Sequence, residues 1–113
     1  MSGEVEIPAE APSFQGGRLH VTVANVTYAD AAARPIGQAT VEDVHHVGGS
    51  STRVPFSITV GADLDPRDSF AVDAWLDTAQ AGRLEKGSLI SDEMALVLTR
   101  GHGRNAHLRL RLV

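Results

Sequence analysis

Two short segments of the sequence carry side chains suited to binding. Trp75 alternates with Asp73 and Asp77 in one segment, and Arg109 alternates with Arg111 in the other. Tryptophan and arginine are enriched where binding energy concentrates at protein interfaces. If the two segments form neighbouring strands, an arginine can stack on the indole or pair with the aspartates. The pattern predicts a binding face for a protein or a small ligand, and a solvated sheet face with cross-strand charge pairs is the other interpretation.

Candidate metal ligands are present, but their spacing is unfavourable. Asp63, Asp65 and Asp68 crowd one loop, and carboxylate oxygens suit a hard cation such as Ca²⁺. The loop lacks the glycine and glutamate of an EF-hand, and such acidic turns commonly bond their own backbone amides. His45 and His46 are adjacent, so in a strand they face opposite sides. We therefore predict no metal site and no cofactor.

The sequence also lacks the usual signatures of an enzyme, a nucleic-acid-binding protein or a membrane span. It contains no cysteine and no G-x-S-x-G motif, and the glycine-rich run 48–52 lacks the lysine of a phosphate-binding loop. Ten basic and fourteen acidic residues give a net charge of −4, which disfavours polyanions, although residues 99–113 carry four arginines and no acid. No run reaches the roughly 18 apolar residues that a bilayer requires. A non-catalytic protein is predicted.

Alternating apolar residues predict the strands that position these side chains. The chain of 113 residues has the length of a single domain, residues 1–113. The predicted strands are residues 4–7, 18–26, 36–47, 53–60, 70–77, 88–90, 94–99 and 106–113. Without a helical stripe, this pattern indicates an all-β fold, a small β-sandwich of about seven to eight mostly antiparallel strands. We expect residues 1–17 to form an edge strand and a loop beside a core of residues 18–113.

Three local features qualify this strand pattern. Pro55 cannot donate a hydrogen bond to a ladder, so the strand at 53–60 is expected at a sheet edge. The apolar spacing changes at Glu42 and Asp43, which predicts a kink there. A parity change near Asn25 predicts either a bulge or the end of the strand. Sheet edges invite pairing with an extended partner segment, so the Pro55 strand and the segment 4–7 are candidate docking edges.

Four stretches of sequence carry a resemblance to a known family. They are Leu19–Val26 with Ala29-Asp30, Val54-Pro55-Phe56, Asp63–Val72, and Val97–Gly101. Together with the strand order they resemble the YscW/YbaY-like family of small bacterial lipoproteins, which includes type III secretion pilotins. The resemblance implies a β-sandwich and, for the pilotin members, binding and guiding of an outer-membrane secretin. Those members carry a secretion signal and a lipid-attached cysteine.

The function predicted from all of this is contact with a partner. Our first hypothesis is an interaction module that binds an unidentified protein through a sheet face or edge, with a second copy of the chain as one candidate partner in a homo-oligomer. The alternative is a small-ligand or carbohydrate-binding module that uses the face of Trp75. As written, the start of the sequence lacks a signal peptide and predicts a cytoplasmic protein, whereas removal of a lipoprotein signal would imply the periplasm or the outer membrane.

Overall fold

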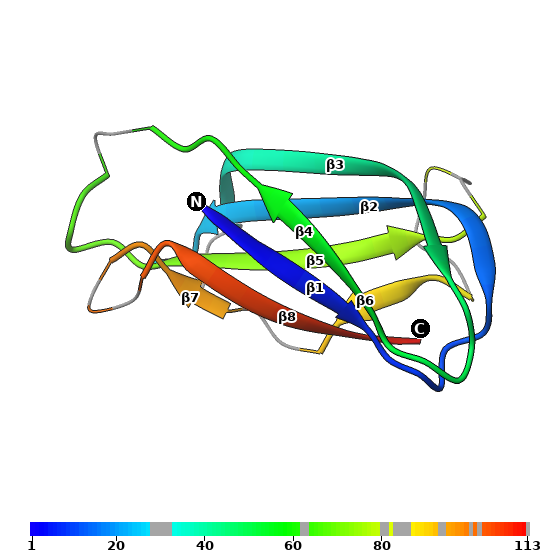
Figure 1. The fold of residues 1–113 in the computed structure, drawn as a ribbon. Helices are drawn as coiled ribbons and strands as arrows, with labels where there is room; N and C mark the ends of the chain where they lie inside the picture. The colour runs from blue at the N-terminus through cyan, green and yellow to red at the C-terminus, as the bar shows by residue number, and fades with distance from the viewer. Residues whose placement is uncertain are drawn as a thin grey trace.

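The fold consists of β-strands joined by loops (Figure 1). The computed structural model describes residues 1–27, 33–61, 64–79, 82, 87–92, 95–99, 101 and 103–112. Its strands are β1 (Ser2–Ile7), β2 (Phe14–Asn25), β3 (Arg34–His46), β4 (Thr52–Ser57), β5 (Phe70–Asp77), β6 (Leu89–Ser91), β7 (Ala95–Val97) and β8 (Asn105–Leu112). The described residues contain no helix, so the all-β prediction is confirmed. Within those residues there is accordingly no helix able to cross a bilayer.

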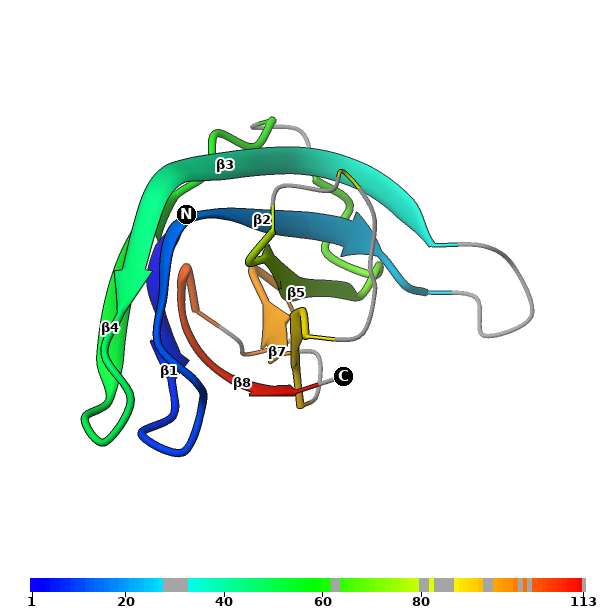
Figure 2. The same ribbon diagram turned by 90° about the vertical axis from the view of Figure 1, so that its right-hand side faces the viewer.

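The strands form one curled sheet around a single core. Their order is β3-β2-β5-β6-β8-β1-β4, with β7 paired to β5 beside this path. Among the described residues every strand pairing is antiparallel except that of β1 with β8, in line with the mostly antiparallel prediction. Figure 2 shows β3 and β4 curving around the inner strands. The fold therefore resembles an incompletely closed barrel more than the predicted sandwich of two stacked sheets.

The N-terminal strand is internal to the sheet, so the prediction of an edge there was wrong. β1 pairs with β4 on one side and with β8 on the other. Val5 and Ile7 are fully buried, and the first residues therefore belong to the core. The sequence could not reveal this because the pairing with β8 joins opposite ends of the chain. The edges are β4, as Pro55 predicted, and β3.

The kink predicted in β3 is present. Asp43 has a φ of 54°, in the left-handed region that a non-glycine residue rarely adopts. Val41 pairs with Leu19 before it and Val44 pairs with Gly17 after it, with a register shift between them. A further shift follows Val23, where Val23 pairs with Gly37 and Ala24 pairs with Pro35, so the extra residue is Ile36 on β3. β2 itself keeps its register with β5 and ends at Asn25, the second of the two outcomes expected there. These irregularities bend β3 over the core, so its two halves run in different directions (Figure 1).

The loops at one end of the barrel are tied to β3 and β4. The buried His46 ring lies with Nδ1 2.8 Å from Thr52 Oγ1 and Nε2 3.2 Å from the Ala11 carbonyl oxygen. Because a carbonyl only accepts, Nε2 carries the hydrogen and the Thr52 hydroxyl donates to Nδ1. Gly48 N donates to Ser13 Oγ at 2.7 Å, and Gly49 N donates to the Ala9 carbonyl at 2.8 Å. The loop after β3 is thereby held against the loop after β1.

Candidate functional site

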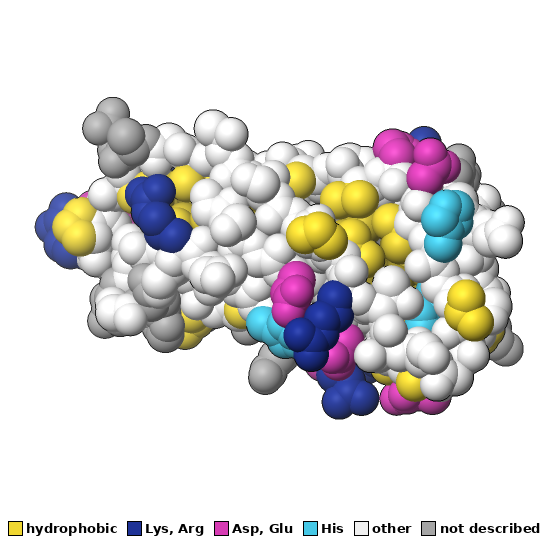
Figure 3. All heavy atoms as spheres, viewed as in Figure 1, with side chains coloured by type: hydrophobic (Ala, Val, Ile, Leu, Met, Phe, Trp, Pro, Cys, Tyr) yellow, Lys and Arg dark blue, Asp and Glu magenta, His cyan; other side chains and the backbone are white. Residues whose placement is uncertain are grey.

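The barrel has a gap between its two edge strands. β3 and β4 are consecutive in the sequence, yet no ladder joins them in the described part of the chain. We call the gap between β3 residues 38–44 and β4 residues 53–57 the seam. In Figure 3, apolar side chains gather on the surface between β4 and the descending half of β3. The seam is therefore the place where core side chains reach the surface.

Apolar side chains on the β3 side of the seam are partly exposed. Val21 on β2 and Val72 on β5 retain no exposed area, and Val44 and Val54 at the seam are also buried, at 5% and 8%. Ala39 on β3 is only partly buried. Val41, also on β3, packs against the same core but is only partly buried. Apolar surface exposed to water is unfavourable. Covering the seam with a partner would therefore contribute favourably to the free energy of binding.

The seam is closed at both ends. At one end the residues after β4 cross β3 at Gly37. A Cβ atom there would lie 2.8 Å from Ile58 Cγ2 and 3.0 Å from the Thr59 carbonyl oxygen, so the approach requires a glycine. At the other end the chain itself runs from β3 to β4 through residues 47–51. A partner must therefore enter from the surface and cannot thread in from an end.

The two edges of the seam are poor templates for an added strand. Ile58 exchanges two backbone hydrogen bonds with Met1, both of 2.8 Å, so its amide points toward β1. Amides alternate along a strand, so Pro55, three residues earlier, faces the seam and offers no donor. On the opposite side the bulge at Asp43 bends β3, another device that protects edges. The seam thus favours contact through side chains over pairing of backbones.

Charged side chains border the seam on both sides. On β3, the carboxylate of Glu42 accepts two hydrogen bonds from Arg18 Nε, of 2.9 and 3.0 Å, and Asp43 and His45 are exposed beside it. On β4, Arg53 Nη1 lies 3.4 Å from Glu4 Oε1. Figure 3 shows acidic and histidine side chains at one border of the apolar area. The site is an apolar gap with a polar border, the usual arrangement of a protein-binding surface.

The predicted face of Trp75 is only partly exposed. The His20 ring stacks on the indole with centroids 4.5 Å apart and planes at 14°. His20 lies opposite Trp75 in the β2–β5 ladder, and its Nε2 is buried without a hydrogen-bond partner. Histidine therefore occupies the place that we predicted for arginine. One face of the indole is covered, which leaves less aromatic surface for a sugar ring.

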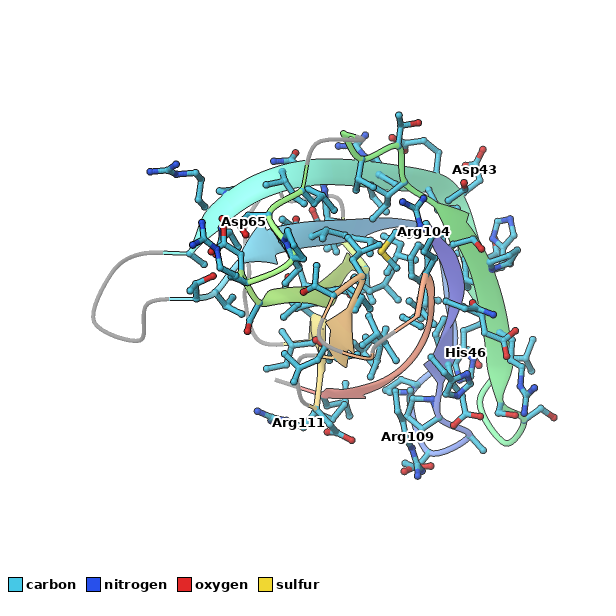
Figure 4. All side chains as sticks on the ribbon, turned by 90° about the vertical axis from the view of Figure 1, so that its left-hand side faces the viewer. Asp43, His46, Asp65, Arg104, Arg109 and Arg111 are labelled. Carbon is cyan, nitrogen blue, oxygen red and sulfur yellow. The ribbon has the colours of Figure 1, made fainter. Side chains whose placement is uncertain are left out.

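The two predicted arginines lie apart from Trp75. β6 separates β5 from β8, so Ile90 stands between Trp75 and Arg111. Arg111 pairs with Asp92 at 3.5 Å, and Arg109 pairs with Glu6 and Glu10, both at 3.7 Å. Both arginines help to line a hollow of about 320 Å³ at the end of β8. Figure 4 shows their side chains on the same side of the barrel. The assumption that these strands are neighbours was wrong, because a short strand lies between them.

The two aspartates of the predicted site differ in their exposure to solvent. Asp73 is exposed, and desolvation by its partly buried surroundings raises the pKa of its carboxyl group. Asp77 is fully buried, although its parity places it on the outer face of β5. Its Oδ2 accepts a hydrogen bond of 2.7 Å from Gly82 N. The prediction that Asp77 is exposed was therefore wrong, because its carboxylate is buried and bonds a backbone amide within the protein.

The described aspartates of the acidic loop accept hydrogen bonds from groups within the protein. Asp63 lies outside the described residues. Asp65 accepts hydrogen bonds from the backbone and guanidinium of Arg67, which lower the pKa of this carboxyl group. Asp68 Oδ2 accepts a hydrogen bond of 2.9 Å from Asn25 Nδ2. No cluster of three or more metal-ligating side chains occurs among the residues that the structure describes.

The β3 residues of the seam were not among the predicted binding residues, although the Pro55 strand on its other side was predicted as a docking edge. A signal for them was present, since Ala39 and Val41 alternate with polar residues in a strand that leads to a second edge strand containing Pro55. Alternation marks these residues as core, and only the missing ladder turns them into surface. Sequence reasoning singled out Trp75 because a tryptophan on a polar face is typical of an interface, and this carries no information about strand pairing.

Fold and seam together define a class of protein, a small all-β domain whose apolar gap is suited to binding another protein. Residues 1–110 match the YscW family, described as type III secretion system lipoprotein chaperones, and the chain belongs to this family. The resemblance noted in the sequence is therefore confirmed.

The same architecture occurs in a solved structure of an alternative pilotin from the type II secretion system of Vibrio cholerae. The TM-score is 0.79 at 19% sequence identity, over 100% of this chain and 95% of the pilotin. At this identity the likeness concerns the fold alone. No curated protein sequence matches the chain.

Proposed function

We propose that this protein is a pilotin-type chaperone that binds an apolar segment of a secretion-system protein in the seam. The open seam is the observation that carries this proposal. It leaves Ala39 and Val41 of β3 only partly buried although both pack against the core, whereas Val21 and Val72 in the β2–β5 ladder are fully buried. A chaperone for a membrane-bound component needs such a surface, because apolar segments must be shielded from water before they insert. The family description as lipoprotein chaperones supports this role.

The partner segment that fits best is an amphipathic helix. Residues 38–44 of β3 span roughly 20 Å at about 3.3 Å per residue, which is the length of about 13 helical residues. A helix satisfies its own backbone and needs only apolar contacts, so Pro55 and the bulge at Asp43 do not impede it. An added strand would lose the hydrogen bond that Pro55 cannot donate. The contact is thus a refinement of our first hypothesis, with side chains in place of a strand edge.

The partner that we propose is a secretin, and the compartment is the cell envelope. The description of the family as type III secretion system lipoprotein chaperones supports this proposal. The protein acts by contact and performs no catalysis in this proposal. Self-association and the alternative of a carbohydrate ligand at Trp75 stay predictions, and the stack of His20 on the indole favours neither.

The experiment compares two neighbouring residues of β3. Val41→Glu places a charge inside the seam, while Thr40→Glu places the same charge on the opposite, exposed face of the strand. Each variant replaces the native protein in its bacterial host, and the assembled secretin in the outer membrane is quantified by immunoblot. We expect Val41→Glu to reduce assembled secretin at least several-fold and Thr40→Glu to leave it unchanged. Val41→Ser, with less risk to folding, should give an intermediate loss.

Two controls keep this test interpretable. Circular dichroism and thermal unfolding verify that each variant is folded, since Val41 also contacts the core. Equal secretin assembly with folded Val41→Glu and with wild type would overturn the seam as the binding site. Unchanged assembly on deletion of the whole protein would overturn the chaperone role itself.

A further inference from the structure

One charge at the border of the seam has no partner. The carboxylate of Asp43 is exposed, and no hydrogen bond or ion pair involves it among the residues that the structure describes. In Figure 4 its side chain projects away from the barrel at the bend of β3. A carboxylate in this position adds a negative potential next to the apolar gap.

The neighbouring charges of the border are compensated. Glu42 is held by Arg18 at 2.9 Å, and Arg53 on the opposite side lies 3.4 Å from Glu4. The His45 ring accepts a hydrogen bond of 3.4 Å from Gly16 N through Nδ1. Since these groups are engaged within the protein, the uncompensated charge at the border is the negative charge of Asp43.

The backbone at this position does not require a carboxylate. The φ of 54° favours glycine and is tolerated by aspartate and asparagine alike. The Asp43 carboxylate forms no hydrogen bond or ion pair in the described part of the chain, so the fold gains no polar contact from its charge. The observation points to a role for this charge in contact with a partner.

We propose that Asp43 selects partner segments that carry a lysine or arginine beside their apolar residues. The proposal rests on the proposed function, because it assigns Asp43 to the border of the same seam. A cation next to the apolar face of a docked helix would meet an unpaired carboxylate, whereas an acidic residue there would be repelled. Asp43 would thus set the specificity and orientation of binding, while the apolar contacts supply most of the affinity.

The test uses two synthetic helical peptides as probes. Both have 14 residues and the same leucines on one face, and they differ only in lysine or glutamate at the positions that flank this face. Binding to the wild-type protein is measured by fluorescence anisotropy of labelled peptide at low and high salt. We expect the lysine peptide to bind about threefold tighter than the glutamate peptide, the size typical of an exposed ion pair, and the difference to vanish in about 1 M salt.

Variants then assign the preference to one carboxylate. Asp43→Asn tolerates the backbone conformation and should abolish the difference between the peptides, and Asp43→Lys should reverse it. Asp73→Asn is the matched control, because it removes an exposed carboxylate on β5 outside the seam, and it should preserve the preference.

The outcomes separate this inference from the proposed function. Equal binding of both peptides to the wild type, or a preference that survives Asp43→Asn, would overturn the role of Asp43 and leave the seam intact as a docking site. Failure of both peptides to bind would overturn the seam as a site for apolar helices and this inference with it.

Discussion

The β2–β5 ladder and the β3–β4 seam show how differently the same kind of sequence behaves in one sheet. Both regions contain strands with alternating apolar residues. β2 and β5 pair over their shared length from Arg18 to Asn25, and Val21 and Val72 are fully buried. β3 and β4 share no ladder, and Val41 stays partly exposed. Pairing, rather than hydrophobicity, decides which apolar row becomes core and which becomes a binding surface.

The largest expected contrast is in the free energy of unfolding. Leu76→Ala removes a fully buried side chain of β5 and should lower this free energy by about 3 kcal/mol. Val41→Ala removes a partly buried side chain at the seam and should lower it by about 1 kcal/mol or less. Urea denaturation of both variants measures the difference. An equal loss of unfolding free energy in the two variants would contradict the comparison. It would mean that Val41 is packed as tightly as Leu76 in the β2–β5 ladder.

The end of the seam offers the next contrast, between two adjacent histidines. His46 is buried and bonds both Thr52 and Ala11, so His46→Ala should lower the free energy of unfolding by about 2 kcal/mol. His45 is exposed, and His45→Ala should change it by less than about 0.5 kcal/mol. Thermal unfolding of the pair provides the measurement. A small effect at His46 would indicate that the loops around the seam are held by other contacts.

A substitution at the protected edge of β4 should have a smaller effect on the stability of the monomer. Pro55→Val restores a backbone donor that faces the seam and should promote self-association by edge pairing. The stability of the monomer should change by less than about 1 kcal/mol, because Pro55 is exposed on the outer face. Analytical ultracentrifugation over a range of concentrations detects the association, with Ser57→Val as the control on the same strand. A variant that stays monomeric at millimolar concentration would show that Pro55 is dispensable for edge protection.

The smallest effect is the pH dependence of Asp73. Its raised pKa means that the native state holds the proton more tightly than the unfolded chain, so ionisation of Asp73 destabilises the fold. This cost is present in full above the folded pKa, and it is lost as the pH falls toward the ordinary value of about 3.9. Asp73→Asn should therefore raise the melting temperature slightly at pH 7 and have no such effect below pH of about 3.5. Unfolding curves at several pH values measure it, and stabilisation that grows in acid would contradict this assignment.

Local features of the fold were accessible from the sequence because they depend on nearby residues. The alternation of apolar residues located the strands, the change of spacing located the kink at Asp43, and the proline located the β4 edge. The boundaries were less accurate, since the strand predicted at 53–60 ends at Ser57. Ile58 still bonds Met1, and the chain then crosses β3 at Gly37, a contact that is not encoded in a local pattern.

The predicted site failed where it depended on neighbours. Parity correctly separates Trp75 and Asp77 from the inner row of β5, but exposure depends on what covers the outer row. Asp77 is buried and bonds Gly82 N, a ring from β2 covers one face of Trp75, and β6 keeps the arginines of β8 apart from both. None of these neighbours is adjacent in the sequence.

The sequence by itself determined the all-β class, most of the strands, one sheet edge and the family of this protein. These properties follow from local backbone preferences and from residue patterns that each segment carries alone. Only the tertiary structure decided that β1 joins β8 within the sheet, that β3 and β4 remain unpaired, and that Val41 and Asp43 therefore border an open apolar gap. The physical reason is that strand pairing joins distant segments, so exposure at each position is a property of the whole assembled sheet.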